Sequence, residues 1–281
     1  MGNLADEIAE IFDRTALFDA LGALVEAIDP KPSGIDLENT AIGIDANVFL
    51  RIAADANAEL VIDYLTGVHS KPLVLPGQAI QEYWNHHHEV ATTIAKPVRA
   101  HFANLKSAVE RLGEEFEDYV DRFDALIQEF ESGHGAMFEP ATVAKTTKFL
   151  SALKNKALIP FAPRIGFEDF SKHRKKTKTP PGFKDSGDGD FFVWVDLLFG
   201  LRKAQTDGAE FSRVVFVTND VKADWSRNGQ AHPILVAEVA SLLNVPFETW
   251  TLKKLVVEIQ QATSPKPEPN VVEEPAAGGA A

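Results

Sequence analysis

The sequence predicts an α/β protein with a central parallel sheet, and three observations support this. Short apolar segments at 41–45, 72–76, 214–218 and 247–251 have the small or β-branched character of strands buried on both faces. Segments with helical apolar spacing lie between them, so strands and helices alternate along the chain. Alternation of this kind places helices on both faces of a parallel sheet, which is a three-layer α/β/α arrangement.

The first part of the chain begins with a helix. Residues 4–28 carry apolar side chains at mixed three- and four-residue spacing, which predicts one amphipathic helix. The Pro- and Gly-containing segment 29–34 breaks it, so residues 1–34 form an N-terminal helix and linker. The next expected elements are a strand at 41–45, a helix at 56–68, a strand at 72–76 and a helix at 77–95.

A different pattern follows Pro97. Apolar residues over 98–130 alternate four- and three-residue steps, close to a 3.5-residue period, which is typical of a long helix packed along another. The segment 141–157 predicts a returning helix. We therefore expect residues 96–157 to form a long helical hairpin inserted into an α/β domain made of 41–95 and 158–261. The outward residues of the hairpin are acidic, which favours contact with a second copy of the chain or a protein partner.

The second half of the α/β domain begins with a segment of little periodicity, 158–189, which is expected to be mostly loop. It contains the densest basic cluster of the chain, and six cations there are candidates for binding a substrate backbone, with a solvated loop as the alternative. These residues are Lys172, Arg174, Lys175, Lys176, Lys178 and Lys184. Further on, the chain predicts a helix from Asp190, a strand at 214–218, a helix at 233–243, a strand at 247–251, a helix at 252–261 and a disordered tail at 262–281.

Composition excludes several classes of protein. The chain has 281 residues and no cysteine, so disulfides and thiolate zinc sites are excluded. A net charge of −13 argues against a protein that coats nucleic acid without specificity. No apolar run approaches the roughly 20 residues of a membrane span, and the acidic N-terminus lacks the basic start of a signal peptide. A cytoplasmic protein without membrane contact is the expectation.

Carboxylates gather where the predicted strands end. Asp45 follows the first strand and Asp220 follows the strand at 214–218, and parallel strands end at one edge of the sheet. Asp190 opens a helix, and Glu82 lies one and a half turns into another. Several carboxylates at one edge repel each other unless cations lie between them, and hard oxygen ligands favour Mg²⁺ or Mn²⁺. The Gly-rich loop before Asp190 adds Asp185 and Asp188.

Some of these residues have a structural alternative. Asp45 and Asp224 both suit a helix N-cap, although either can also serve a metal. Asn47 is a candidate to orient Asp45 or a metal-bound water, and equally a turn-forming residue. Trp225 is expected in the core or at its rim, with stacking on a base as the alternative. The three histidines at 86–88 point about 100° apart on a helix, so they cannot share one ion.

The order of these motifs resembles that of PIN-domain nucleases. Asp45-Ala-Asn-Val-Phe-Leu50 is similar to their first motif, Glu82 to their second, Asp190 to their third, and Val217-Thr-Asn-Asp220 to their fourth. The resemblance covers about 41–95 and 180–255. Residues 181–185, 189–191 and 218–225 resemble in particular the larger bacterial PIN-like proteins, which also carry a helical insertion.

The resemblance implies a PIN-like fold and metal-dependent hydrolysis of phosphodiester bonds, with RNA expected rather than DNA. It implies catalytic roles for Asp45, Glu82, Asp190 and Asp220, with Asp185 as a further metal ligand. Two rivals remain. A haloacid-dehalogenase-type phosphohydrolase needs a second Asp two residues after the first, where this chain has Asn47. A PIN-like scaffold would bind RNA or protein without cutting.

Overall fold

A parallel sheet forms the centre of the molecule. The computed structural model describes residues 3–15, 18–29, 36–89, 95–111, 117–133, 140–220 and 222–264. Its four strands pair in the order β2-β1-β3-β6, and every pairing is parallel. The predicted fold class is therefore confirmed. The strands are β1 (Thr40–Ile44), β2 (Leu73–Val74), β3 (Arg213–Val217) and β6 (Phe247–Trp250).

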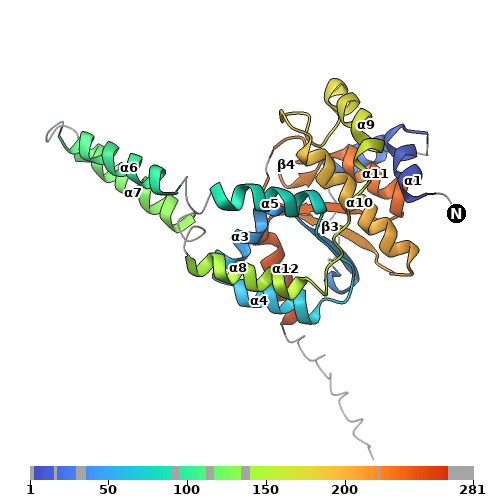
Figure 1. Ribbon diagram of the computed structural model, residues 1–281, viewed down its shortest axis with the longest axis horizontal. Helices are drawn as coiled ribbons and strands as arrows, with labels where there is room; N and C mark the ends of the chain where they lie inside the picture. Colours follow the sequence, from blue (N-terminus) through green and yellow to red (C-terminus); the bar gives the residue numbers. More distant parts are fainter. Residues whose placement is uncertain are drawn as a thin grey trace, which may run out of the picture.

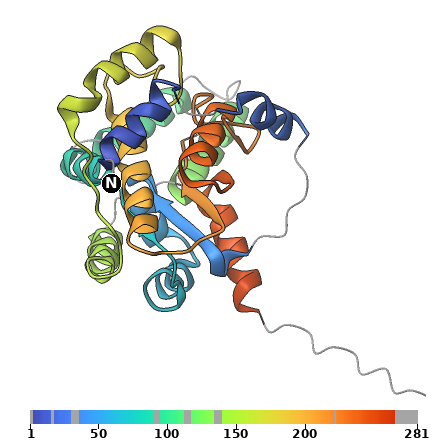
Figure 2. The same ribbon diagram turned by 90° about the vertical axis from the view of Figure 1, so that its right-hand side faces the viewer.

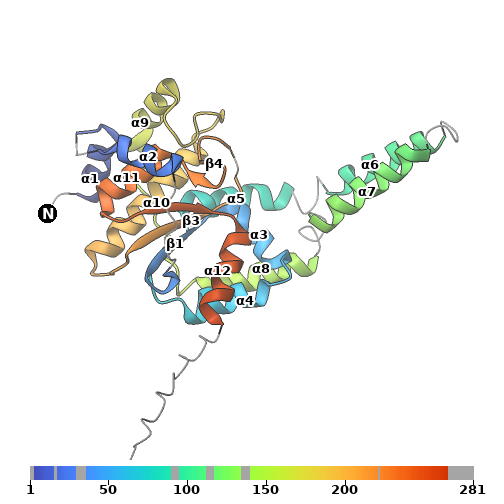
Figure 3. The ribbon, with the colours of Figure 1, turned by 180° about the vertical axis from the view of Figure 1, so that it is seen from behind.

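Two hydrophobic cores cover the two faces of the sheet, because successive strand residues point to opposite sides. Val214 and Phe216 of β3 belong to one core, and Val215 and Val217 to the other. The first core is closed by α1 (Leu4–Phe12), α10 (Gly189–Thr206) and α11 (Pro233–Leu243). The second is closed by α3 (Ala46–Ala54), α4 (Ala58–Asp63), α8 (Pro140–Leu153) and α12 (Leu252–Thr263). Figure 3 shows β1 and β3 between these two groups of helices.

The register of the sheet aligns the strand ends that matter for the site. Ile44 of β1 lies opposite Val217 of β3, so Asp45 and Thr218 leave the sheet at the same level. The Asp45 backbone N donates a hydrogen bond to the Val217 carbonyl at 3.0 Å. The predicted meeting of the two strand ends at one edge is confirmed.

The N-terminal segment differs from the prediction of one helix over 4–28. Two helices are present, α1 and α2 (Ala20–Ile28). Arg14 adopts a left-handed backbone conformation with φ of 57°, which ends the first helix. The Asp19 side chain then accepts a hydrogen bond from the Gly22 backbone N at 2.8 Å and starts the second. The second helix lies against α11, as Figure 2 shows.

The helical insertion is also arranged differently from the prediction. The hairpin consists of α6 (Ala95–Glu110) and α7 (Glu117–Gly133), which extend away from the sheet domain (Figure 1). The prediction of a single helix over 98–130 is therefore wrong, and residues 112–116 lie outside the described part. The segment expected to return along it, α8, instead packs on α3, because Phe149 and Leu153 are buried in the core of the body.

A helix occupies nearly half of the segment 158–189, which was expected to be mostly loop. Helix α9 (Arg164–Thr177) buries Phe167, Ser171 and Arg174, which lie on one side of a helix at four- and three-residue spacing. Phe167 contacts Phe12 of α1 with ring centroids 5.9 Å apart. The buried stripe was not recognised in the sequence because its third member, Arg174, is charged and lies within the basic cluster.

The remaining elements are short or peripheral. Among the described residues, no helix has both the length and the apolar character needed to cross a membrane. The helix predicted at 77–95 is present over its described part, 77–89, and residues 90–94 lie outside the described residues. The helix predicted at 56–68 ends in a π-helical turn. The elements are η1 (Leu37–Asn39), the π-helical turn η2 (Tyr64–Val68), α5 (Gly77–Glu89), and a small antiparallel pair, β4 (Ser226–Arg227) and β5 (Gln230–Ala231).

Candidate functional site

Asp45 is buried at the carboxyl end of β1, where it holds the start of α3. Its Oδ1 accepts a hydrogen bond from the Ala46 backbone N at 2.6 Å. Its Oδ2 accepts from Thr218 Oγ1 and from Asn47 Nδ2, both at 2.7 Å. The N-cap reading of Asp45 is thus correct for one oxygen, while the other oxygen faces the loop that follows β3.

Asn47 and Thr218 join the loops after β1 and β3. Asn47 Nδ2 donates also to Thr218 Oγ1 at 3.2 Å, and Asn47 Oδ1 accepts from the Asn219 backbone N at 3.0 Å. Thr218 Oγ1 in turn accepts from the Asp220 backbone N at 3.0 Å. These bonds fix Asp45 and Asp220 relative to each other. Thr218 was not among the predicted site residues, although its place directly after a buried strand is the same signal that singled out Asp45.

Burial changes the charge state of Asp45. Its pKa is raised to about 6, mainly by desolvation, while repulsion from Glu82 and Asp220 adds to the rise and the hydrogen bond from Thr218 opposes it. The effect of Glu82 and Asp220 shows that three of the predicted catalytic carboxylates lie within electrostatic reach of one another. Near neutral pH, a cation beside Asp45 would relieve this unfavourable charge.

Glu82 reaches the site from α5 and lies against the start of α10. Gln78 Nε2 donates to Glu82 Oε1 at 3.0 Å. A Cβ atom added to Gly189 would collide with that same oxygen. Glycine at the first position of α10 therefore gives the Glu82 carboxylate room beside Asp190, the next residue of the helix.

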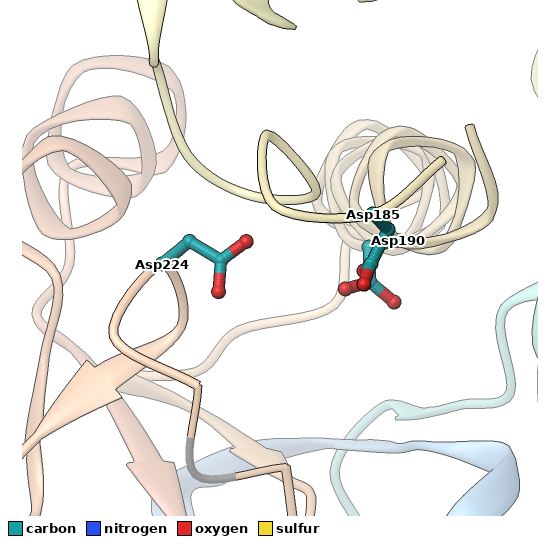
Figure 4. Close-up of side chains that lie close together, drawn as sticks. All are labelled: Asp185, Asp190 and Asp224. Atoms are coloured by element: carbon teal, nitrogen blue, oxygen red, sulfur yellow. The ribbon is translucent and has the colours of Figure 1, made fainter. Parts of the chain in front are cut away.

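Asp185, Asp190 and Asp224 form the tightest carboxylate cluster in the described chain. One oxygen from each lies within 4.8 Å of the others. Figure 4 shows Asp185 and Asp190 together at the start of α10, with the Asp224 carboxylate directed toward them from the loop after β3. Asp224 is fully buried, and its Oδ2 accepts from the Gly182 backbone N at 3.1 Å. Its Oδ1 is buried without any hydrogen-bond partner.

The two carboxyls at the start of α10 titrate differently. Desolvation and the hydrogen bond with Asp185 raise the pKa of Asp190 to about 7, against a lowering by Trp225. For Asp185, partial burial acts against ionisation, but hydrogen bonds with Asp190 and Lys222 outweigh it and lower the pKa. The pair therefore keeps one proton between its two carboxyls up to nearly neutral pH.

Lys222 is the cation of this cluster, and the sequence reasoning missed it. Its Nζ lies 2.8 Å from Asp185 Oδ2, 3.0 Å from Asp220 Oδ2 and 3.4 Å from Asp190 Oδ2. Partial burial disfavours its charge, but the hydrogen bonds to Asp185 and Asp220 prevail and raise its pKa. The sequence does place a lysine two residues after Asp220, the aspartate that follows a strand, and this position could have identified Lys222 as a site residue.

Asp188 points elsewhere. Its Oδ1 pairs with Lys175 Nζ at 2.7 Å, and Lys175 lowers its pKa. Lys175 also donates to the carbonyls of Ser186 and Gly187. Within the described residues Asp188 is outside the carboxylate cluster, and Lys175 fixes the loop that leads to α10.

Arg174 does not suit the substrate-binding role predicted for it. It is buried, pairs with Glu238 at 2.7 Å, donates to the Pro180 carbonyl and lies 4.8 Å from the centre of the Phe12 ring. Lys172 is exposed but pairs with Glu168 at 2.8 Å. The exposed members of the basic set, with no ion pair among the described residues, are Lys176, Lys178 and Lys184.

Trp225 is a core residue, as expected. It stacks on Phe216 with centroids 5.1 Å apart, and its indole Nε1 donates to Asp190 Oδ2 at 3.1 Å. The ring is therefore not available to stack on a base. The side chains of residues 86–88 lie outside the described part.

The donor set suits a hard divalent cation. Every candidate ligand is a carboxylate oxygen, which is the chemistry that Mg²⁺ and Mn²⁺ prefer. A buried polar atom normally has a partner, so the unpaired Asp224 Oδ1 beside two further carboxylates is an open ligand position. Burial raises the pKa values of Asp45 and Asp190 to about 6 and about 7, and a cation bound beside these carboxylates would favour their charged forms.

Comparison with known proteins agrees with this geometry. Residues 167–238 match the model of a family described as a PIN like domain. No curated protein and no solved structure matches the chain. The matched region contains most of α9 and all of α10 and β3, and it includes Asp185, Asp190, Asp220 and Asp224, whereas Asp45 and Glu82 precede it in sequence. The family match and the carboxylates at the end of a parallel sheet together show that this part of the chain is similar to a PIN-like domain.

Proposed function

We propose that the protein is a metal-dependent nuclease that hydrolyses phosphodiester bonds, with RNA as its substrate. The carboxylate cluster at the sheet edge is the observation that carries the proposal, because it collects oxygen ligands from segments far apart in sequence. The PIN-like match supports it, since PIN-like domains are generally nucleases.

The site residues divide into three roles under this proposal. Asp45, Glu82, Asp185, Asp190 and Asp220 would hold Mg²⁺ or Mn²⁺, with Asp224 as an additional ligand. Bound there, the cation would polarise the scissile phosphate and lower the pKa of a water molecule. Asn47 and Thr218 keep Asp45 in place through the hydrogen bonds described above.

Substrate contact is assigned to the exposed part of the basic segment. Lys176, Lys178 and Lys184 lie in and after the last turn of α9, in the segment that leads to the carboxylate cluster. Their charges would attract a phosphate backbone toward an otherwise acidic protein. Neutralising all three should weaken RNA binding and flatten its dependence on salt, and an unchanged salt slope would rule out this assignment.

Asn47 also bears on the rival phosphohydrolase. A haloacid-dehalogenase-type enzyme needs an acid at this position to donate a proton. Asn47 instead donates its amide to Asp45 and accepts from the loop after β3, which is a positioning arrangement. The structure therefore favours the nuclease over this rival.

The decisive assay incubates the protein with single-stranded RNA and single-stranded DNA, with Mn²⁺ or with EDTA. Asp45→Asn and Asp220→Asn should each lower cleavage at least roughly 100-fold, as expected for removal of electrostatic groups at a reacting phosphate. Asp63→Asn changes an exposed aspartate of α4 and should leave cleavage intact. Cleavage that survives both site substitutions would place the activity elsewhere. Mn²⁺ binding without cleavage of any substrate would indicate a scaffold.

A further inference from the structure

Lys222 joins parts of the chain that are distant in sequence. Its ammonium group contacts Asp185 in the loop before α10, Asp190 in the first turn of α10 and Asp220 in the loop after β3. A lysine ammonium has three donors, and here three acidic residues surround it. It pairs with more acidic side chains than any other lysine that the structure describes.

The ammonium group lies beside carboxylates that could also bind a divalent cation. Asp185 and Asp190 belong both to the set that Lys222 contacts and to the carboxylate cluster with Asp224. The Asp224 Oδ1 atom is left without a partner. The lysine therefore neutralises one side of the cluster and leaves the other side open.

We propose that Lys222 is a built-in cation that holds the carboxylate cluster together in the metal-free protein and competes with a divalent ion for Asp185 and Asp190. The inference rests on the metal site of the proposed function. It assigns to Lys222 a positioning role that sets how tightly the site binds its metal.

Two consequences follow from Coulomb's law. Without the ammonium group, the carboxylates of Asp185, Asp190 and Asp220 repel each other, so the metal-free protein becomes less stable. A divalent ion then enters without repulsion from a neighbouring positive charge, so it binds more tightly. A residue that only packed against the site would produce the first effect without the second.

The test replaces Lys222 with methionine, which keeps the length and apolar stem of the side chain but removes its charge. Lys254→Met is a matched control. Lys254 has the same exposed side-chain fraction, 39%, and pairs with Glu248 at 2.8 Å outside the cluster. Mn²⁺ binding to metal-free protein is measured by titration calorimetry, and thermal unfolding is followed in EDTA and with Mn²⁺.

Lys222→Met should bind Mn²⁺ roughly ten-fold or more tightly than the unmodified chain. Its unfolding midpoint should fall in EDTA and recover when Mn²⁺ is added, while Lys254→Met shows neither the change in affinity nor the recovery. If Lys222→Met fails to fold, Lys222→Gln provides the same comparison. Equal or weaker Mn²⁺ binding in a folded Lys222 variant overturns the inference but leaves the metal site standing. If neither the variant nor the unmodified chain binds Mn²⁺, both the inference and the metal site fail.

Discussion

Helix α10 contributes residues to two regions of buried charge: in the paired region every charge has a partner, and in the other region charge is left uncompensated. In the paired region, Arg174 pairs with Glu238, whose second oxygen accepts from the Trp194 indole at 2.7 Å. Asp196, also on α10, accepts from the backbone N atoms of Gln78 and Ala162, both at 2.8 Å, and from Arg164 at 2.7 Å. At the start of the same helix, the carboxylate cluster has Lys222 as its cation.

The difference separates charges that are compensated within the protein from charges that leave room for a ligand. Burying an ion pair is tolerated when each charge has a partner and its hydrogen bonds are satisfied. Glu238 and Asp196 meet that condition. The carboxylate cluster does not, and the raised pKa of Asp190 and the unpaired Asp224 oxygen are the signs of the deficit. Such a deficit has a stability cost, and proteins retain it where a ligand supplies the missing charge.

The largest expected loss of stability comes from breaking the ion pair between Arg174 and Glu238. Arg174→Met leaves Glu238 buried without its cation, and loss of one partner of a buried pair typically costs about 3–5 kcal/mol. The free energy of unfolding in urea measures this. Lys176→Met, two residues along the same helix and exposed, should change it by less than about 0.5 kcal/mol. If Arg174→Met lowered the free energy of unfolding by less than about 1 kcal/mol, the buried pair of Arg174 and Glu238 would not be a structural requirement of the fold.

His69 tests what happens to a buried titratable group that has no charged partner. Neither ring nitrogen has a hydrogen-bond partner, and desolvation lowers its pKa from 6.5 to about 4. The unfolded chain therefore takes up a proton between these values while the folded chain does not. The free energy of unfolding is therefore unaffected by His69 protonation above about pH 6.5. It falls as the pH drops toward 4, by on the order of 3 kcal/mol, because the unfolded chain is then protonated at His69 and the folded chain is not.

The measurement is the difference in unfolding free energy between pH 7.5 and pH 4.5, compared for the unmodified chain and His69→Leu. Other groups that titrate in this range contribute equally to both proteins, so the comparison isolates His69. The variant should lose less stability on acidification. An identical pH dependence in the two proteins would mean that His69 takes up its proton in the folded state.

Substitution of Asp45 is expected to raise the free energy of unfolding, by less than the change expected for His69. Its folded pKa of about 6 exceeds the ordinary value of 3.8, so its ionisation opposes folding as the pH rises through this range. Asp45→Asn should therefore stabilise the metal-free protein at pH 8 by about 1–2 kcal/mol, less than the full shift because an amide suits the donors of Asn47 and Thr218 less well.

Asp196→Asn is the contrasting variant, because Asp196 is fully paired and its loss should destabilise the protein. Both variants are compared with the unmodified chain by urea unfolding in EDTA. If Asp45→Asn destabilised the protein as much as Asp196→Asn, the carboxylate of Asp45 would be one of the charges that are compensated within the protein.

The smallest expected effect is that of a substitution at Gly189. An added methyl group should favour α10 but push the Glu82 carboxylate away from Asp190. Gly189→Ala should lower RNA cleavage roughly ten-fold, about 1.4 kcal/mol in transition-state stabilisation, with little change in unfolding free energy. Gly187→Ala is the control, since an added Cβ there meets no atom within 4 Å. Equal activity of the two variants would show that Glu82 is not needed in its observed place.

Much of the fold could be predicted because the relevant signals are local. The strands are short apolar runs, and polar residues such as Asp45 and Thr218 follow them directly. Helices with a clear apolar stripe, such as α11, were found close to their true limits. Helix α9 was missed because its inward stripe includes Arg174, whose burial depends on Glu238 from a distant helix.

The sequence by itself determined the parallel sheet and the set of carboxylates at its edge, since both follow from residue type and order. Only the tertiary structure decided which charges are satisfied. It paired Arg174 with Glu238, turned Asp188 toward Lys175 and placed Lys222 among Asp185, Asp190 and Asp220. The physical reason is that charge compensation depends on distance in space, and residues 174 and 238, or 185 and 222, become neighbours only when the chain has folded.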